Sequence, residues 1–180
     1  MNLKAIPLML SMIPSVLRGP RVHDLEKIKA IARKAYPSVE QISLDTLDGW
    51  MHKPEQSFLL VDVRSPEEFA VSHLRGAVNL RTPEEIATAV QEQKPSRTVL
   101  YCSVGFRSSR LAHVLTARGI ANMMNLEGAI FQWANEGRAV FQGEVPVRQV
   151  HPFSKRWAGL LRKGVADGIS RDKPGAHPMA

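Results

Sequence analysis

Cysteine is almost absent from this sequence: Cys102 is the only one among 180 residues, so no internal disulfide can form. Nothing therefore argues for an oxidising compartment, and a free thiol fits a reducing cytoplasm, which is the location we expect. The six histidines are scattered, and none stands at a metal-ligand spacing from the cysteine. Repeats and low-complexity tracts are missing too, so the length predicts one domain with extensions.

A long hydrophobic run is also missing. The most apolar stretch, residues 5–17, is shorter than the roughly 20 residues that a bilayer-spanning helix needs. Its length fits the apolar region of a signal peptide, but residues 18–21 follow it without a small-x-small cleavage pattern. Pro7 and Pro14 interrupt any continuous helix. We therefore rank a packing or partner segment first, an interfacial anchor second and a signal peptide third.

The positive charge lies in the flanks. The net charge is +7, but residues 35–147 carry 10 basic and 13 acidic side chains, while residues 1–34 and 148–180 contribute +5 each. A nucleic-acid-binding fold would carry basic residues on its reading surface, so we expect no nucleic acid partner. The flanks are either simply solvated or contact anionic lipid, an acidic partner or RNA. Peripheral membrane contact is therefore one expectation.

Strands and helices alternate between residues 39 and 135. Short β-rich runs predict strands, and capped, proline-started or periodic segments predict the helices between them. The strands are predicted at 39–43, 57–63, 77–80, 98–101 and 121–126, and the helices at 44–51, from 65 onward, at 82–93, 109–118 and 129–135. This order predicts an α/β fold: a mainly parallel five-stranded sheet with helices on both faces.

The flanks contain less regular structure. An amphipathic helix is predicted over residues 22–36, with Asp24 as its N-cap and Pro37 marking its end. Packing of this helix on the core is favoured over membrane binding. Past residue 140 the pattern dissolves, because glycines weaken a rough helical spacing, and residues 171–180 are expected to be disordered.

The rest of the chain is organised around Cys102, the first residue of a loop between a strand and a helix. Gly105 permits a sharp turn, and Ser108 or Ser109 can cap the helix that follows. The amides of Ser103 to Ser108 can then point toward the sulfur, and such N–H groups attract negative charge and lower a thiol pKa. A lone cysteine is more often a small buried hydrophobe, but this context favours a nucleophile in an anion cradle.

Asp62 lies near the end of another predicted strand. Asp62 and Cys102 are thus both expected at the carboxyl ends of parallel strands, where ligands of such sheets bind. The two residues can therefore share one crevice.

Three regions resemble motifs of the rhodanese sulfurtransferases. Residues 102–108, Cys-Ser-Val-Gly-Phe-Arg-Ser, resemble the C-x-x-G-x-R-S active-site loop of that family. Residues 60–69 and 73–80 resemble its D-V-R-x-x-x-E-[FY] and H-I-x-G-A-x-N segments, and residues 126–133 resemble its L-x-G-G-x-x-x-W closing motif. The resemblance covers residues 38–147.

The resemblance implies a rhodanese-like three-layer domain at residues 37–147. An apolar and basic amphipathic extension, residues 1–36, precedes it, and a basic, partly disordered tail, residues 148–180, follows. Ser72 and Ala129 stand where the family has glycine. These departures concern local turns rather than the chemistry.

The resemblance also implies sulfur transfer. Cys102 would take the outer sulfur of thiosulfate or another persulfide donor and pass it to a thiophilic acceptor such as cyanide or a cellular thiol. Asp62 and Arg64 would support the site, and no metal or cofactor is required. Partners would be small-molecule donors and acceptors, with an acceptor protein as a further candidate. The expected substrate-binding residues are Ser103, Val104, Gly105, Phe106, Arg107 and Ser108.

Several side chains have two interpretations. Arg107 either receives an anionic donor or fastens the loop through a salt bridge to Asp62 or Glu68. For Asp62 and Arg64 a structural role, tying a strand end to a helix start, is favoured. His73 is favoured to satisfy backbone groups rather than to act as a base.

Two other functions compete. A cysteine-dependent phosphatase or arsenate reductase uses a related loop, but with five residues between Cys and Arg and commonly a His before the Cys. Here four residues intervene and Tyr101 precedes, so the cradle is smaller and suits a single sulfur. The second alternative is a non-catalytic rhodanese-like module that only binds partners. A degraded loop would favour this alternative, whereas this loop is intact. We expect the flanks to tune location or partners and not to build the catalytic site.

Overall fold

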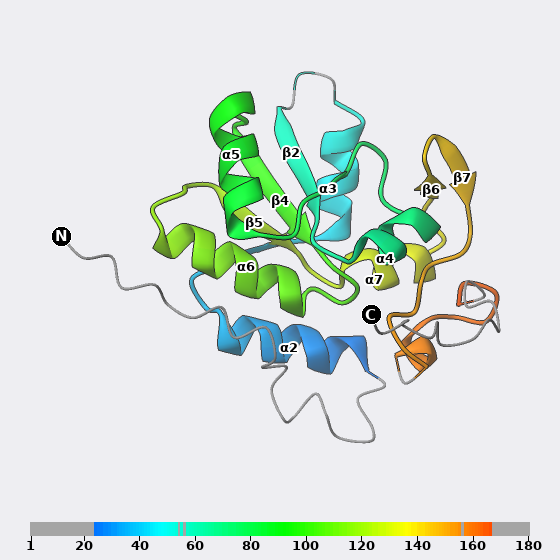
Figure 1. Cartoon of the computed structure of the whole chain (residues 1–180). Helices are drawn as coiled ribbons and strands as arrows, with labels where there is room; N and C mark the ends of the chain where they lie inside the picture. Colours follow the sequence, from blue (N-terminus) through cyan, green and yellow to red (C-terminus); the bar gives the residue numbers. More distant parts are fainter. Residues whose placement is uncertain (1–23, 54, 56, 156, 167–180) are drawn as a thin grey trace, which may run out of the picture.

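Five parallel strands form the central sheet of the computed structural model, in the order β1-β5-β4-β2-β3 (Figure 1). The structure describes residues 24–53, 55, 57–155 and 157–166, so the apolar stretch 5–17 and the tail end 171–180 lie outside the described residues. The strands of this sheet are β1 (Glu40–Ile42), β2 (Phe58–Asp62), β3 (Val78–Asn79), β4 (Arg97–Tyr101) and β5 (Met123–Leu126). The helices are α2 (Leu25–Ala35), α3 (Leu44–Met51), α4 (Pro66–Val71), α5 (Pro83–Gln93), α6 (Phe106–Ala117) and α7 (Ala129–Asn135).

Helices cover both faces of the sheet, which confirms the predicted α/β fold. One core cluster joins the strands to α5 and α6 through Ile86 and Leu115. The opposite cluster joins them to α3 and α7 through Leu47 and Ile130. Because side chains alternate along a strand, β2 contributes Val61 to the first cluster and Leu60 to the second. The carboxyl ends of β2 and β4 are thereby held side by side.

Local sequence signals fix the helix starts. Ser65 and Thr82 cap α4 and α5, each with a glutamate three residues on that returns the hydrogen bond and a proline in the first turn. Asp24 caps α2 by accepting a hydrogen bond from the Glu26 amide. Ile28 of α2 is fully buried, so the predicted packing of this helix on the core is confirmed.

The chain past residue 140 is more ordered than its sequence predicts. β6 (Val140–Gln142) and β7 (Val145–Val147) form an antiparallel hairpin, and a short 3-10 helix, η1 (Ala158–Leu160), follows. Val150 and Leu161 are buried in the same cluster as α3 and α7. The helical spacing of apolar residues does not predict the structure of this segment, because single long-range contacts hold it rather than one face of a helix.

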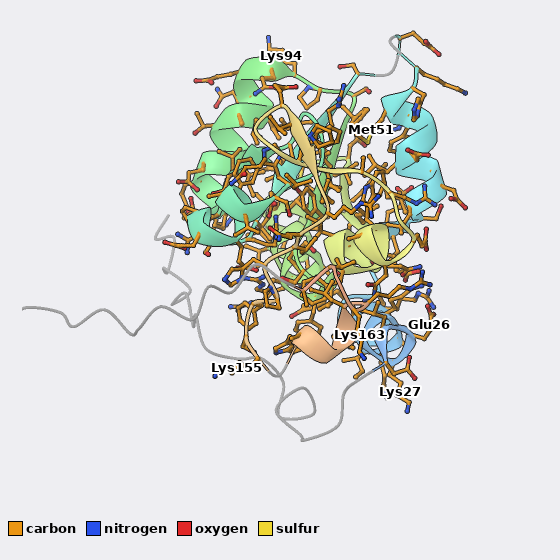
Figure 2. All side chains as sticks on the ribbon, turned by 90° about the vertical axis from the view of Figure 1, so that its right-hand side faces the viewer. Glu26, Lys27, Met51, Lys94, Lys155 and Lys163 are labelled. Atoms are coloured by element: carbon orange, nitrogen blue, oxygen red, sulfur yellow. The ribbon has the colours of Figure 1, made fainter. Side chains whose placement is uncertain are left out.

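The C-terminal segment and α2 lie at one end of the molecule. Figure 2 shows Lys155 and Lys163 at the same end as Glu26 and Lys27, away from Lys94 at the end of α5. Buried Leu160 joins the same core cluster as Ile28, which ties the two flanks to each other and to the domain. Among the described residues, no helix has the length and apolar character needed to cross a bilayer.

Candidate active site

The Cys102 loop is built by a glycine turn between β4 and α6. Gly105 has φ of 90° and is the N-cap of α6, without a side-chain capping hydrogen bond. A Cβ at this position would lie 3.3 Å from Asn125 Nδ2 and 3.3 Å from Leu126 O, so both the backbone conformation and the space favour glycine.

The helix after the loop begins earlier than predicted. We expected it at Ser109, with a serine cap, but α6 starts at Phe106 and the cap is Gly105. The Ser109 hydroxyl instead donates to Gly105 O at 2.8 Å, inside the first turn. The earlier start brings the amide of Ser108 into the first turn, next to the sulfur.

Helix α7 fixes the loop from the other side. The Ile130 amide donates to Cys102 O at 3.3 Å, and the Phe131 amide donates to Ser103 O at 3.0 Å. The loop carbonyls therefore point away from the sulfur, and its amides remain on the sulfur side. The Gly105 amide donates to Cys102 Sγ at 3.2 Å, which confirms one member of the predicted ring of N–H groups.

The surroundings of Cys102 favour the thiolate. Burial raises the pKa of this thiol, but the charge of Arg107, the hydroxyl and amide of Ser108 and the amide of Val104 lower it more, so it lies below the ordinary cysteine value. Among the described residues, the buried Ser108 hydroxyl has no other hydrogen-bond partner. The site thus holds a buried thiol whose anionic form is stabilised.

Arg107 is fastened to Glu68. Its guanidinium donates to both carboxylate oxygens of Glu68, at 3.0 and 3.2 Å, and to Ser103 Oγ at 3.0 Å. Ser103 Oγ also donates to Glu68 at 3.0 Å. The salt-bridge interpretation of Arg107 is therefore confirmed, with Glu68 rather than Asp62 as the partner.

Asp62 and Arg64 form a second, fully buried ion pair. Arg64 Nη2 lies 2.7 Å from Asp62 Oδ2, and both side chains are 0% exposed. The same nitrogen donates to Ser72 O at 2.6 Å. Asp62 pairs with Tyr101 in the sheet, one residue before Cys102, but it does not line the cavity beside the sulfur. Asp62 and Cys102 thus share a sheet edge, but the prediction that they share one crevice is wrong. The buried pair of Asp62 and Arg64 matches the structural role favoured for those two residues.

His73 and Ala129 hold turns around the site. The amide of His73 donates to Phe141 O at 2.8 Å, and its ring Nδ1 lies 3.0 Å from Leu74 O. The predicted backbone role of this histidine is therefore confirmed. Ala129 has φ of 51°, a left-handed conformation that glycine adopts with less strain.

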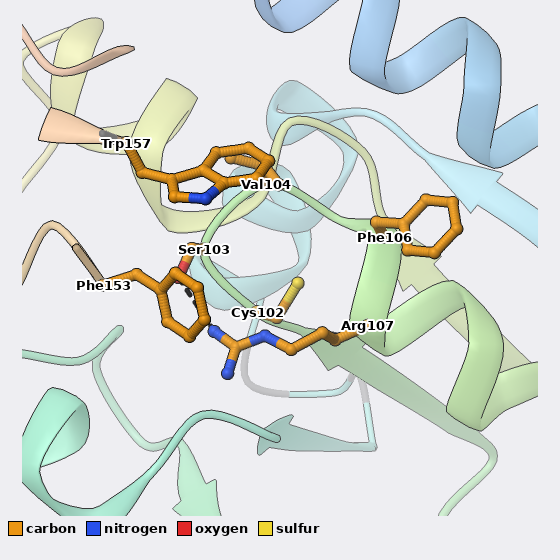
Figure 3. Close-up of a pocket in the computed structure, with 7 residues that line it drawn as sticks. All are labelled: Cys102, Ser103, Val104, Phe106, Arg107, Phe153 and Trp157. Atoms are coloured by element: carbon orange, nitrogen blue, oxygen red, sulfur yellow. Dashed lines mark hydrogen bonds between the residues drawn. The ribbon is translucent and has the colours of Figure 1, made fainter. Parts of the chain in front are cut away.

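A cavity of about 30 Å³ opens beside the sulfur. Two of its lining residues, Phe153 and Trp157, come from the C-terminal segment, and Figure 3 shows them entering from the side opposite α6. The expectation that the flanks do not build the site is therefore wrong. The sequence signal for this contribution is the presence of two aromatic residues in a tail that is otherwise basic. The lining residues are Cys102, Ser103, Val104, Phe106, Arg107, Phe153 and Trp157.

Comparison with known proteins agrees with this geometry. Residues 43–136 match the family described as "Rhodanese-like domain". The chain belongs to this family. The match spans the cysteine loop, the Asp62–Arg64 pair and the helices on both faces of the sheet.

Relatives of this rhodanese-like protein carry different names. A protein from Allochromatium vinosum named "Sulfurtransferase" is 30% identical over 106 residues, which cover 59% of this chain and 98% of that one. A protein from Prochlorococcus marinus named "tRNA uridine(34) hydroxylase" is 28% identical over 99 residues, covering 48% of this chain and 32% of that one. The chain thus spans about a third to a half of the length of several curated relatives that it matches.

A solved structure shows the same fold. Thiosulfate sulfurtransferase from Pseudomonas aeruginosa superposes with a TM-score of 0.55 at 17% identity, covering 73% of this chain and 26% of that one. At this identity the likeness concerns the fold of the rhodanese-like domain alone.

A second cavity in this rhodanese-like protein gathers basic side chains. It measures about 550 Å³ and lies between α7, the β6–β7 hairpin and the C-terminal segment. Arg138 is paired there with Asp45 and Asp48, whereas for Arg148, Arg162 and Lys163 the described residues provide no ion-pair partner. Part of the basic charge of the tail thus lies at a site separate from Cys102.

Arg107→Gln is expected to move the pH dependence of Cys102 alkylation to higher pH. Only the thiolate reacts, so the rate falls as the pH drops through the thiol pKa, and removing the Arg107 charge raises that pKa. Near neutral pH we therefore expect a lower alkylation rate in Arg107→Gln than in the unmodified protein. The measurement is iodoacetamide alkylation against pH, with Arg110→Gln, one turn along α6, as the control. Equal shifts in both variants would contradict a specific effect of Arg107.

Proposed function

We propose that this rhodanese-like protein transfers sulfane sulfur through a persulfide on Cys102. The observation that carries the proposal is the buried thiol with a lowered pKa, facing a cavity of about 30 Å³. A cavity of that volume holds about one water-sized group, which matches the one sulfur atom that a persulfide adds. The relative named as a sulfurtransferase, covered almost completely by this chain, supports the same reaction.

The first half of the reaction loads the cysteine. The Cys102 thiolate attacks the outer sulfur of a donor, the new S–S bond forms, and the bond between the two donor sulfurs breaks. The electron pair leaves with the inner sulfur, as sulfite when the donor is thiosulfate. The Gly105 amide, 3.2 Å from Sγ, and the other loop amides then stabilise the negative charge of the persulfide.

The second half of the reaction removes the sulfur from Cys102. A thiophilic acceptor, cyanide or a cellular thiol, attacks the outer sulfur, and the electron pair returns to Cys102 as the thiolate. These two half-reactions need no metal or cofactor. We propose small-molecule donors and acceptors, with an acceptor protein as a further candidate, in the reducing cytoplasm that a single working thiol suits. The hydroxylase relative matches this chain over 99 residues, 32% of its own length, so the activity in its name is not carried over to this chain.

Phosphate ester hydrolysis is the alternative that the anion-binding loop raises. A phosphoryl group needs room for its oxygens, and its leaving oxygen needs a proton donor, which contributes about 100-fold or more to such reactions. The cavity measures about 30 Å³, and among the described residues that line it there is no aspartate or glutamate. Nearby Glu68 is held by Arg107.

We therefore expect sulfur transfer from a sulfane donor to cyanide, with aryl phosphate hydrolysis at least about 100-fold slower. The two rates are measured on one preparation, as thiocyanate formation and as phenol release. A Cys102→Ser variant provides the background for both. Phosphate hydrolysis that exceeds sulfur transfer and disappears in Cys102→Ser would overturn the proposal in favour of a phosphatase.

A further inference from the structure

The C-terminal segment over residues 150–165 is fixed at its base. The Val150 amide donates to Val165 O at 2.9 Å, so the two ends of the segment meet. Asn135 of α7 donates through Nδ2 to Leu160 O at 2.7 Å, and its Oδ1 accepts from the Arg162 amide at 2.8 Å. The segment is thus closed on itself and bonded to the last residue of α7.

The other end of this segment presents two aromatic rings to the catalytic loop. Phe153 lies with its ring 4.7 Å from the Arg107 guanidinium carbon, and its centroid is 6.4 Å from that of Trp157 in an edge-on arrangement. Phe153 has φ of 63°, a backbone conformation that costs free energy for a bulky residue and is found where surrounding contacts hold it. Its side chain is nevertheless 39% exposed, so the ring covers the mouth of the cavity rather than filling the core.

Glu68 offsets part of the positive charge that a donor meets at this mouth. Among the described residues that line the cavity, Arg107 is the only cationic one, and Glu68, itself 3% exposed, accepts two hydrogen bonds from it. The walls that remain around the sulfur are mostly apolar, from Val104, Phe106 and the two tail aromatics. Figure 3 shows the guanidinium beside the ring of Phe153, with its hydrogen bond to Ser103.

Because the cavity is small, the transferred sulfur of a donor and the rest of the donor must occupy different places. A space of about 30 Å³ holds little more than the sulfur to be transferred, so the rest of the donor must lie at the mouth, against Phe153 and Trp157. For thiosulfate that part is an anionic sulfonate, which meets the negative faces of aromatic rings. For the persulfide of an organic thiol it is an apolar substituent, which packs on those rings.

We propose that Phe153 and Trp157 make the Cys102 site selective for persulfides of apolar organic thiols over thiosulfate. The proposal rests on the sulfur transfer proposed above. The step is Cys–S⁻ + R–S–SH → Cys–S–SH + R–S⁻: the outer sulfur forms a bond to the Cys102 sulfur, the S–S bond of the donor breaks, and its electron pair leaves on the thiolate R–S⁻. The step places one thiolate charge in the site, whereas thiosulfate brings a dianion beside the thiolate.

The test compares benzyl persulfide with thiosulfate as donors, with cyanide as the acceptor in both assays. In the unmodified protein we expect kcat/KM to be at least about tenfold higher for benzyl persulfide. In Phe153→Ala/Trp157→Ala it should fall about tenfold for that donor, the effect of one good apolar contact, and stay constant or rise for thiosulfate. Trp157→Phe should retain most of the preference, and Gln149→Ala, in the exposed connection before the segment, should behave like the unmodified protein.

The ratio of the two donors separates selectivity from structural damage. A loss of stability or of loop order would lower both activities together, and an equal fall for both donors overturns the inference. An unchanged ratio in the double alanine variant overturns it as well. If mass spectrometry detects no added sulfur on Cys102 with either donor, sulfur transfer itself fails. If sulfur is added from both donors equally well, sulfur transfer stands and the selectivity fails.

Discussion

Cys102→Ser is expected to lower sulfur transfer to cyanide by about 1,000-fold or more, the scale on which loss of a covalent nucleophile acts. A hydroxyl cannot hold the sulfur as a persulfide, and Cys102 is the only cysteine of the chain, so no second thiol can replace it. The measurements are thiocyanate formation and intact-protein mass after incubation with the donor. The unmodified protein should gain one sulfur atom and lose it when cyanide is added, and the serine variant should gain none.

The fold of this variant should persist. Serine is close in size to cysteine, and the Gly105 amide that donates to the sulfur can donate to a hydroxyl, so we expect the free energy of unfolding to change by about 1 kcal/mol. Urea unfolding of both proteins checks this. A well-folded serine variant that still turns over at a substantial rate would mean that sulfur transfer does not pass through Cys102.

Arg64→Met should destabilise the protein by about 3–5 kcal/mol, because it leaves the carboxylate of Asp62 buried without its partner. The variant also removes the hydrogen bond to Ser72 O, which joins the end of α4 to the carboxyl end of β2. The measurement is the free energy of unfolding in urea. The double variant Asp62→Asn/Arg64→Met should be less destabilised than the sum of the two single variants.

The matched control is an arginine in an exposed pair. Arg118 bonds to Glu84 at 2.6 Å, but the two side chains are 44% and 67% exposed, so Arg118→Met should cost less than about 1 kcal/mol. If the two arginine variants lose similar stability, burial of the Asp62–Arg64 pair has no special importance, and these residues act through another contact.

Most of the fold could be predicted from local signals. Helix starts carry their own chemistry: the Ser65-Pro66-Glu67-Glu68 sequence contains a cap, a proline and the glutamate that completes the capping box, and α4 begins at that proline. Helices 44–51 and 129–135 were predicted with the bounds that the structure shows. A strand was predicted at residues 57–63, where β2 lies, and β2 contributes to both core clusters.

The candidate site could be predicted in part. The strand, glycine turn and helix around Cys102 place its sulfur near the Gly105 amide, and Glu68 was one of two partners considered for Arg107. The start of α6 was missed because Gly105, in a left-handed conformation, ends the loop without the side-chain cap that sequence reasoning looks for.

The aromatic cover could not be predicted from the sequence. Phe153 and Trp157 reach the loop only because Val150 meets Val165 and Asn135 holds residues 160 and 162. None of these contacts follows a helical or strand period, and all join residues that are far apart in the chain. The composition describes the tail by its charge, and part of that charge lies at the other cavity.

The complete burial of Cys102 also bears on how long the protein survives in the presence of oxidants. A thiolate is the form that peroxide converts first to a sulfenic acid and then irreversibly to a sulfinic acid, and susceptibility rises with exposure. Phe153 and Trp157, which line the cavity beside the sulfur, give an apolar donor a surface to pack on, whereas they only narrow the path of peroxide to Cys102. Selection of the donor and slower inactivation of the protein are thus two effects of the same pair of rings.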